Sequence, residues 1–388
     1  MNQSKGSPQR FHPSLNGVEA LLANALILGL LVVAAVAVHH QPDRYYTALQ
    51  EDRLVEWASF WAFLLTAIGM TVAAARQWRR AHRVPWFLAL VALFCLFVAG
   101  EEISWGQRLL GFQSPTFFQE QNFQQEVNLH NVVATALRKL ALKGLIAGYG
   151  IVLPLVVLVG LVRRGMDRLG IVSPPVALAP SFLAILITYQ LYPWKFTGEL
   201  VEVMLGLAFL FAATSAMEVF AGPRARSPRA KALRPILIWS LVIGLGVVSA
   251  AISRHLVAAD PSLIETARLE TEALRRDYLE LLREGGGEDL KRCGLHKRLY
   301  SYVKKYERHE LQQGAFARLS EKVQTTERGR FFLDPWNSPY WIRQTCGEDR
   351  SDWQVLIYSF GPNRMRDSDR KQLHADDIGA TVHSHGSV

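Results

Sequence analysis

The sequence predicts a polytopic α-helical membrane domain of about seven transmembrane helices, followed by a small α+β domain outside the membrane. Half of the 388 residues are apolar, and they crowd into residues 18–252, whereas the charged residues follow. About seven runs in this region approach the roughly 20 apolar residues that cross a bilayer core. A soluble all-helical core is the alternative, but so many long uncharged runs rarely occur in one soluble domain.

The expected spans follow one another through the first two thirds of the chain. The fifth run is the shortest and follows Pro174-Pro175. In the first run, "AVA" at Ala35–Ala37 resembles a signal-peptide cleavage site, but the apolar stretch is longer than a signal core, so we expect a retained anchor. The spans are Val18–Val38, Leu54–Ala75, Val84–Gly100, Leu142–Val162, Val176–Leu191, Leu200–Phe220 and Ile236–Ile252.

Basic residues predict the orientation of these spans. Clusters of Arg and Lys lie in alternate loops, and the intervening loops are poor in both. The positive-inside rule therefore places the amino terminus in the cytoplasm and everything after Ile252 outside it. Nucleic-acid binding is another explanation for the formal charge of +9, but basic cytoplasmic loops account for most of it, so we expect the lipid bilayer and no nucleic acid as a partner. The clusters are Arg76, Arg79, Arg80 and Arg83; Arg163, Arg164 and Arg168; and Arg224, Arg226, Arg229, Lys231 and Arg234.

Two of the three cysteines fall in the exported part of the chain. Cys293 and Cys346 would meet an oxidising compartment there, which favours a disulfide over two free thiols. Cys95 lies inside the third span, where a packing role is expected.

Acidic residues mark the outer end of the third span, in "FVAGEEISWGQRLLGF". The spacing of Glu101, Trp105 and Arg108 predicts one shared helical face. The topology also brings Glu102 toward Glu56, Glu202 and His130 at the same membrane face. Glu101, Glu102 and His130 are therefore candidate metal ligands or acid–base groups for a reaction on a lipid-linked substrate. The alternative is that these interfacial carboxylates simply meet water, since no known catalytic motif accompanies them.

Two spans begin alike, with "LVEWASFWAFLLTA" at Leu54 and "LVEVMLGLAFLFAA" at Leu200. Both would run from the outside inwards, so a duplicated three-helix unit is one explanation. Composition alone also makes short apolar matches common.

The polar tail begins with an amphipathic helix after Pro261 that ends at Gly285–Gly287. "PYWIR" and "WQVLIYSF" then predict a β-hairpin. We expect three regions: residues 1–256 as the membrane domain, 257–330 as a helical stem, and 331–388 as the hairpin with an acidic loop.

The residues "LDPWNSPYWIR", "VLIYSFGPN" and "DDIGATV" carry a specific resemblance. They resemble, in the same order, the carboxy-terminal region of protein G, the major pseudopilin of type II secretion systems. The resemblance implies that a helix precedes a small sheet. It rests on Asp334, Pro335, Trp336, Pro339, Tyr340, Tyr358, Ser359, Gly361, Asp376, Asp377, Ile378 and Gly379.

The pseudopilin family binds calcium in the loop between these strands, so the resemblance implies a Ca²⁺ site held by Asn363, Asp376, Asp377 and a carbonyl near Phe360. Asn363 stands where the family has Asp. Oxygen ligands from a flexible loop suit this cation. A solvated acidic turn is the alternative.

The amino terminus differs from that of a pseudopilin, because Glu19 is not the fifth residue of a single apolar helix and several spans follow. "GEEISWGQR" and "NLHN" resemble bacterial multi-spanning membrane proteins without an assigned activity. Together the resemblances imply a bacterial inner-membrane protein that presents a pseudopilin-like periplasmic domain to envelope or secretion proteins. A membrane-embedded enzyme is the alternative, and the sequence leaves open whether the protein is an enzyme.

Overall fold

The chain folds into two compact units. The computed structural model describes residues 13–50, 52–110, 112–122, 125–221, 228–256, 260–284, 293–323, 326–347, 352–364, 366, 373 and 376–383. Unit 1 comprises Met1–Trp105 and Val133–Ile252, and unit 2 comprises Gly106–Val132 and Ser253–Val388. The expected boundary at residue 256 lies close to the one observed after Ile252. Gly106–Val132, which the sequence analysis placed in the membrane domain, instead belongs to unit 2.

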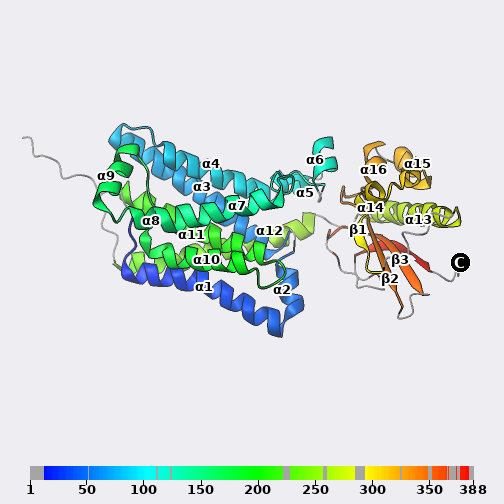
Figure 1. Cartoon of the computed structure of the whole chain (residues 1–388), viewed down its shortest axis with the longest axis horizontal. Helices are drawn as coiled ribbons and strands as arrows, with labels where there is room; N and C mark the ends of the chain where they lie inside the picture. The colour runs from blue at the N-terminus through cyan, green and yellow to red at the C-terminus, as the bar shows by residue number, and fades with distance from the viewer. Residues whose placement is uncertain are drawn as a thin grey trace, which may run out of the picture. The chain divides into compact units, whose positions relative to one another are not determined.

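Unit 1 is helical throughout its described elements (Figure 1). Five helical stretches are long and apolar enough to cross a membrane by length and composition: Gly17–His40, Leu54–Arg80, Thr135–Val156, Thr197–Val219 and Lys231–Ser253. The expected runs at Val84–Gly100 and Val176–Leu191 form shorter helices. The elements are α1 (Gly17–His40), α2 (Pro42–Ala48), α3 (Leu54–Ala81), α4 (Trp86–Glu102), η1 (Ser104–Gly106), α7 (Thr135–Ala147), η2 (Gly148–Val152), α8 (Leu153–Val156), α9 (Gly160–Leu169), η3 (Val176–Leu178), α10 (Ala179–Leu191), α11 (Thr197–Val219) and α12 (Pro228–Leu256).

The fourth expected run is interrupted. The helix that begins with α7 passes through the π-helical turn η2 just before Pro154 and ends at Val156. Proline has no N–H to donate and its ring crowds the carbonyl four residues earlier, so a local change of hydrogen-bond pattern is expected there. A new helix, α9, starts at Gly160, and the expected end of this span at Val162 is therefore wrong.

Helices α3 and α11 lie side by side and run parallel. A Cβ on Gly206 of α11 would lie 2.9 Å from the Cβ of Ala62 in α3, and one on Gly69 would lie 3.3 Å from the Cβ of Ala213. Toward their ends, Arg76 donates a hydrogen bond to the carbonyl of Met217 at 2.9 Å. Small residues thus let the two backbones approach, as they do where apolar helices associate in lipid.

Helix α12 runs antiparallel to this pair. Gly246 in its second half packs on the first turns of α3, where a Cβ would lie 3.2 Å from the amide nitrogen of Ala58. Near its start, Arg234 forms ion pairs with Glu19 of α1 at 2.9 Å and with Glu218 of α11 at 2.7 Å. We call the end of unit 1 that contains Arg76 and Arg234 the basic end.

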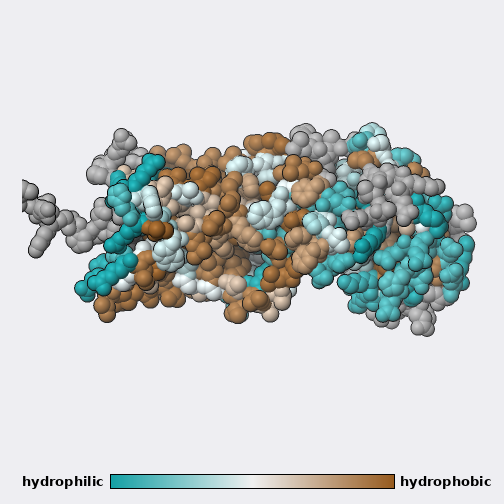
Figure 2. All heavy atoms as spheres, turned by 90° about the horizontal axis from the view of Figure 1, so that it is seen from above, coloured by the Kyte–Doolittle hydropathy of each residue, from teal (hydrophilic) through white to brown (hydrophobic). Residues whose placement is uncertain are grey.

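The centre of unit 1 is α11, which is 89% buried over its most apolar stretch, whereas the corresponding figures for α1 and α12 are 17% and 22%. Phe209 of α11 contacts the rings of Phe63, Phe94, Tyr149 and Phe182, which come from four other elements. The outer helices expose apolar side chains such as those on α1, α4 and α12. Figure 2 shows that hydrophobic residues cover much of the visible face of unit 1. A helical unit that is apolar outside as well as inside is compatible with a membrane protein.

Unit 2 contains a four-stranded antiparallel sheet in the order β1-β2-β3-β4. The predicted hairpin is confirmed, because β2 pairs with β3 from Trp341 opposite Tyr358 to Cys346 opposite Trp353. The strands are β1 (His296–Arg298), β2 (Trp341–Cys346), β3 (Trp353–Ser359) and β4 (Ile378–His383). The helices are α5 (Gln107–Leu110), α6 (Thr116–Gln121), α13 (Pro261–Arg283), α14 (Leu299–Tyr306), η5 (His309–Gln312), α15 (Ala315–Val323) and α16 (Thr326–Phe331).

Helix α13 begins where the sequence predicts, with Pro261 in its first turn and Asp260 accepting a hydrogen bond from the Ser262 amide at 2.9 Å. It packs against β3 and β4 and buries Leu274, Tyr278 and Leu281 in the core of unit 2. The same helix supports the start of α15: Asp277 accepts hydrogen bonds from the amides of Ala315 and Phe316 at 2.7 and 3.0 Å.

Candidate functional site

Four carboxylates meet at the end of unit 1 opposite the basic end. Glu56 lies in the first turn of α3, Glu102 is the last residue of α4, and Glu199 and Glu202 lie in the first turns of α11. The Glu102 carboxylate interacts electrostatically with Glu202, Glu199 and Glu56, in decreasing order. We call these four residues the acidic cluster. The parallel packing of α3 and α11 explains it, because it places both Leu-Val-Glu starts at one end.

Among the described residues, Arg138 and Tyr189 are neighbours of the acidic cluster. Arg138 in the first turn of α7 interacts electrostatically with Glu202. Tyr189 near the end of α10 interacts electrostatically with Arg138 and with Glu202. Ser59 of α3 lies beside Glu102. Carboxylates grouped at membrane depth with an arginine and a hydroxyl can bind a cation, exchange protons or contact a charged headgroup.

The Glu101 side chain contacts Trp105, which is not a member of the acidic cluster. Its carboxylate accepts a hydrogen bond from the Trp105 indole at 2.7 Å. The predicted continuous helical face is wrong, because Ser104 and Trp105 adopt positive φ values of 46° and 54° and end the helix. The indole instead folds back over Gly100, where a Cβ would lie 2.9 Å from the ring. The Arg108 side chain lies outside the described residues.

The third expected member of this site, His130, belongs to a different unit from the two glutamates. His130 is in the turn before α7 and belongs to unit 2, whereas Glu101 and Glu102 belong to unit 1. Among the described residues, no group of three or more His, Cys, Asp or Glu side chains is arranged to hold a metal ion.

In unit 2, Asp334 is the centre of a buried hydrogen-bond network. Its carboxylate accepts hydrogen bonds from the backbone amides of Trp336 and Ser338 at 3.0 and 2.8 Å and from the Ser359 hydroxyl at 2.5 Å. The Ser359 hydroxyl in turn accepts a hydrogen bond from the Gly361 amide at 2.8 Å. The "LDPWNS" turn is thereby fastened to the end of β3. Burial raises the pKa of Asp334, although the Ser359 and Ser338 hydrogen bonds act in the opposite direction.

A second buried network joins the helix to the same turn. Arg328 forms an ion pair with Glu270 of α13 at 2.7 Å, and it also donates to the carbonyl oxygens of Leu333 and Asp334. The Tyr340 hydroxyl donates to the same Glu270 carboxylate at 2.8 Å. Burial raises the pKa of Glu270, and the positive charge of Arg328 opposes this.

The residues expected to bind calcium lie on two segments that touch. Gly361 has a φ of 66°, and a Cβ there would lie 1.9 Å from the carbonyl oxygen of Asp376. Asn363 lies in the same turn as Gly361, and Asp377, which is 7% exposed, follows Asp376. The structure therefore brings two carboxylates, one amide and the nearby backbone carbonyls into one region. These groups would all bind through oxygen atoms, and oxygen is the type of ligand that calcium prefers.

Gly379, from the third matching stretch, also has a structural role. It pairs with Tyr358, and a Cβ there would lie 2.5 Å from the carbonyl oxygen of Ile357. Burial raises the pKa of Tyr358 to about 12, and its hydroxyl lies 2.9 Å from Nε2 of His296.

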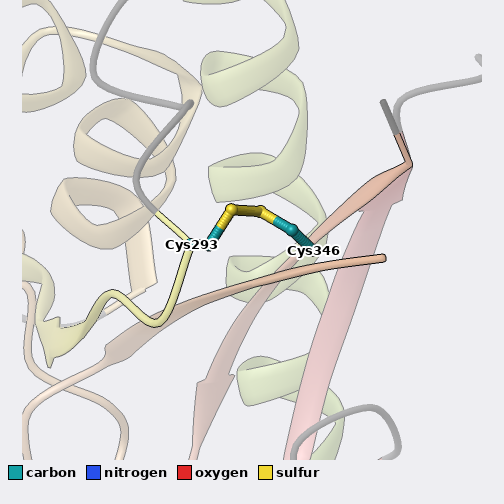
Figure 3. The surroundings of a disulfide bond; sticks show 2 residues. All are labelled: Cys293 and Cys346. Atoms are coloured by element: carbon teal, nitrogen blue, oxygen red, sulfur yellow. A yellow bond between two sulfur atoms is a disulfide. The ribbon is translucent and has the colours of Figure 1, made fainter. Parts of the chain in front are cut away.

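Cys293 and Cys346, the pair expected from the sequence, form a disulfide (Figure 3). Their Cα atoms are 5.3 Å apart, a normal separation for this bond. The bond connects the segment before β1 to the end of β2. Cys95 is a buried free thiol in α4.

Comparisons with protein-family models, with curated proteins and with solved structures found no match.

The sequence analysis missed several residues of these sites. Arg138 and Tyr189 join the acidic cluster from helices that the linear pattern does not relate to Glu102. Glu270 and Arg328 could have been suspected from one signal. Glu270 falls between Ala267 and Leu274 at helical spacing, so it lies on the apolar face of α13, where a carboxylate needs a buried partner.

Proposed function

We propose that the chain is a multi-pass protein of the bacterial inner membrane with seven spans, a cytoplasmic amino terminus and unit 2 in the periplasm. The helix directions in unit 1 support the seven spans. Helix α3 ends at the basic end and α7 begins beside the acidic cluster, so α4 traverses the unit between them. Likewise α10 traverses it, since Ser181 near its start contacts Asn24 of α1 and Tyr189 near its end reaches the acidic cluster.

The charges support the orientation. Arg76 and Arg234 lie at the basic end, together with the Arg-rich ends of α3 and α9. The positive-inside rule places this end in the cytoplasm. Helix α12 begins at the basic end and leads to unit 2, so unit 2 emerges on the opposite side. A disulfide in unit 2 fits an oxidising compartment.

We infer that unit 2 has a binding or assembly role in the envelope and resembles the carboxy-terminal domain of pseudopilin protein G. The observation that carries this proposal is the Asp334 network. Asp334, Ser359 and Gly361, which match the family pattern, hold the turn to the sheet, and Gly379 allows β4 to pair closely with β3. Helix α13 precedes the sheet, which is the order of elements that the resemblance implies.

The partner surface that this fold offers is the edge of the sheet. The outermost strands are β1 and β4, and β4 spans six residues against three for β1. An exposed edge strand can pair with an extended segment of another protein. We therefore expect envelope or secretion proteins to dock along β4.

Orientation can be tested by impermeant maleimide labelling of cysteine variants in spheroplasts. The exposed positions Glu265 of α13 and Arg83 at the basic end serve as a matched pair. We expect Glu265→Cys to react in intact spheroplasts and Arg83→Cys to react after permeabilisation. The reverse pattern would overturn the proposed topology.

Partner docking can be tested with a photoreactive amino acid at Thr381 of β4 in the full chain, with Glu265 as the control position. We expect adducts with discrete envelope proteins from Thr381 and none of the same proteins from Glu265. Identical adduct patterns at both positions, or none at Thr381 in a correctly oriented protein, would argue against the assembly role.

A second candidate function is a membrane-embedded reaction on a lipid-linked substrate. The convergence of Glu102 with Glu202, Glu199, Glu56 and Arg138 favours it. Two carboxylates in different surroundings can act as acid and base, and an arginine can bind a phosphate. Lipid extracts from cells with Glu102→Gln or Glu202→Gln should then accumulate an unprocessed lipid-linked precursor. An unchanged lipid profile at normal protein abundance in both variants would exclude this reaction.

A further inference from the structure

In the segment Gly106–Val132, polar side chains are buried and large apolar side chains are exposed. Within its described residues, every side chain counted as buried is polar, and no apolar side chain is buried. Large apolar side chains are exposed instead: Leu110 is 77% exposed and Phe117 is 54% exposed, and Phe112 and Leu129 are exposed as well. A water-soluble segment shows the opposite arrangement. The buried polar residues are Gln107, Ser114, Gln119, Asn122, Gln125 and Asn128.

The polar side chains hold the segment in one conformation. Ser114 donates a hydrogen bond to the carbonyl of Gln125 at 2.6 Å, and Asn122 donates to the side chain of Asn128 at 2.8 Å. The amide of Val127 donates to the Gln107 side chain at 2.7 Å. These hydrogen bonds inside the segment fix its backbone, and the backbone displays the exposed apolar side chains.

The same polar side is attached to the rest of unit 2. Gln125 donates a hydrogen bond to the carbonyl of Phe331 at 3.3 Å, and Arg330 forms an ion pair with Glu120 at 3.1 Å. Gln107, Phe112 and Glu126 also line a small cavity together with Trp336. The segment therefore has one polar side that faces unit 2 and exposed apolar side chains that remain available to another surface.

The chain connections restrict what that surface is. Helix α4 ends at Glu102, eight residues before Leu110, and α7 begins at Thr135, six residues after Leu129. A fully extended chain spans at most about 3.6 Å per residue, so Leu110 and Leu129 stay within roughly 20–30 Å of helix ends that lie at the membrane surface in the proposed topology. Exposed apolar side chains on an ordered segment within that reach match the way interfacial segments enter a bilayer.

We propose that Gly106–Val132 rests on the lipid surface of the outer leaflet, with Leu110, Phe117 and Leu129 inserted at the boundary between headgroups and acyl chains. Unit 2 is attached to the polar side of this segment. The inference rests on the proposed placement of α4 and α7 in the membrane. It assigns Gly106–Val132 the role of a lipid-contacting platform for unit 2, a role that a cytoplasmic or fully solvated loop would not need.

The test uses the full chain in phosphatidylethanolamine–phosphatidylglycerol nanodiscs. Leu110→Cys and Phe117→Cys each carry an environment-sensitive fluorophore, and Leu269→Cys on α13, where the native leucine is 51% exposed, is the matched control. The native disulfide is left oxidised and Cys95 is buried, so neither competes for the label. Nitroxides are placed either on the lipid headgroup or at a shallow acyl position.

At positions 110 and 117 we expect a blue-shifted emission and a loss of fluorescence with both nitroxide lipids. At position 269 we expect neither effect. Equal quenching at all three positions, or quenching by aqueous iodide at 110 and 117 as strong as at 269, would overturn the proposal. A blue shift that nitroxide lipids do not quench and that disappears when the protein is diluted would show a second copy covering the segment, which also overturns it.

The maleimide labelling of Arg83→Cys and Glu265→Cys separates this result from the proposed topology. Correct labelling with no lipid quenching refutes the platform alone. Reversed labelling refutes the topology on which the platform rests.

Discussion

The carboxylate of Glu270 and the guanidinium of Arg328 form an ion pair at 2.7 Å whose side chains are 0% and 2% exposed. The pair links the long helix α13 to the segment that precedes β2. Removing one member of a buried pair leaves the other charge without compensation in a region of low dielectric. The fold of unit 2 therefore depends on this contact more than on its surface ion pairs.

We expect Glu270→Ala to lower the free energy of unfolding of unit 2 by about 3–5 kcal/mol. Glu272→Ala is the matched control, because Glu272 lies in the same helix and its ion pair with Arg275 is partly exposed, at 47% and 31%. The control should cost less than about 0.5 kcal/mol. Hydrogen exchange of β2 and β3 amides in the detergent-solubilised full chain measures both. Equal effects of the two substitutions would refute the prediction.

The buried carboxyl of Asp334 predicts a pH dependence. Because burial raises its pKa in the folded state, folded unit 2 binds a proton over a range where the unfolded chain, with a pKa of about 3.9, has released it. The associated stability is complete below about pH 4 and is lost as the pH rises through the folded-state pKa. Glu270 contributes with the same sign.

The difference in unfolding free energy between the parent and Asp334→Asn isolates the Asp334 contribution. Measured by hydrogen exchange corrected for its intrinsic pH dependence, the parent should lose stability relative to the variant as the pH rises from 4. A difference that stays constant between pH 4 and 8, or changes in the opposite direction, would contradict the raised pKa.

The disulfide predicts a stability difference set by the length of the loop it closes. Cys293 and Cys346 are 53 residues apart, for which the chain-entropy model gives about 4 kcal/mol. The double variant with Cys293→Ser and Cys346→Ser should lower the stability of unit 2 by this amount. Cys95→Ser is the control, because Cys95 is not part of the bond. If reduction of the parent leaves the exchange rates of β2 unchanged, the bond contributes nothing to the fold.

The sequence predicted the elements whose signal is local. Apolar runs located the long helices of unit 1, and the alternating pattern of "PYWIR" and "WQVLIYSF" located β2 and β3, because both depend on periodicity within one segment. The Leu-Val-Glu starts at Leu54 and Leu200 also indicated that two helices enter from one side. Their direct contact through Ala62 and Gly206 is a property of packing that the match did not state.

Features that depend on contacts between distant segments could not be predicted in this way. Nothing in "SPTFFQEQNFQQEVNLHN" shows that Gln125 would bond to the carbonyl of Phe331, more than 200 residues away, so the segment was assigned to the wrong unit. The break at Ser104-Trp105 was missed for a different reason. Positive φ at two non-glycine residues is rare, and spacing rules assume a continuing helix.

Because α3 and α11 pack closely, we expect one methyl group added between them to lower the stability of unit 1. Gly206→Ala would place its Cβ 2.9 Å from that of Ala62, whereas Gly244→Ala in α12 would meet no atom within 4 Å. Overpacking typically costs about 1–3 kcal/mol, and alanine at an unhindered helical glycine stabilises by about 0.4–1 kcal/mol. Thermal unfolding in detergent should therefore shift in opposite directions for the two variants. A loss of stability in Gly244→Ala equal to that in Gly206→Ala would show that the close approach of α3 and α11 is not the cause.

The loop around Gly361 is the predicted calcium site. We propose that Asn363, Asp376, Asp377 and a carbonyl near Phe360 supply oxygen ligands, since Gly361 brings the two segments into contact. A ligand that binds only the folded state stabilises it by about 2.7 kcal/mol at one hundred times its dissociation constant. Calcium should therefore raise the unfolding midpoint of unit 2 in the chelator-treated full chain. Magnesium should do so weakly, because it demands a rigid octahedral site.

The control for this prediction is the exposed Asp352 at the start of β3. Asp376→Asn and Asp377→Asn should abolish the calcium-dependent shift, because each removes a negative ligand, and Asp352→Asn should leave it intact. Loss of the shift in all three variants would indicate general screening of negative charge. No shift in the parent at millimolar calcium would mean that the two carboxylates form a solvated acidic turn, the alternative that the sequence left open.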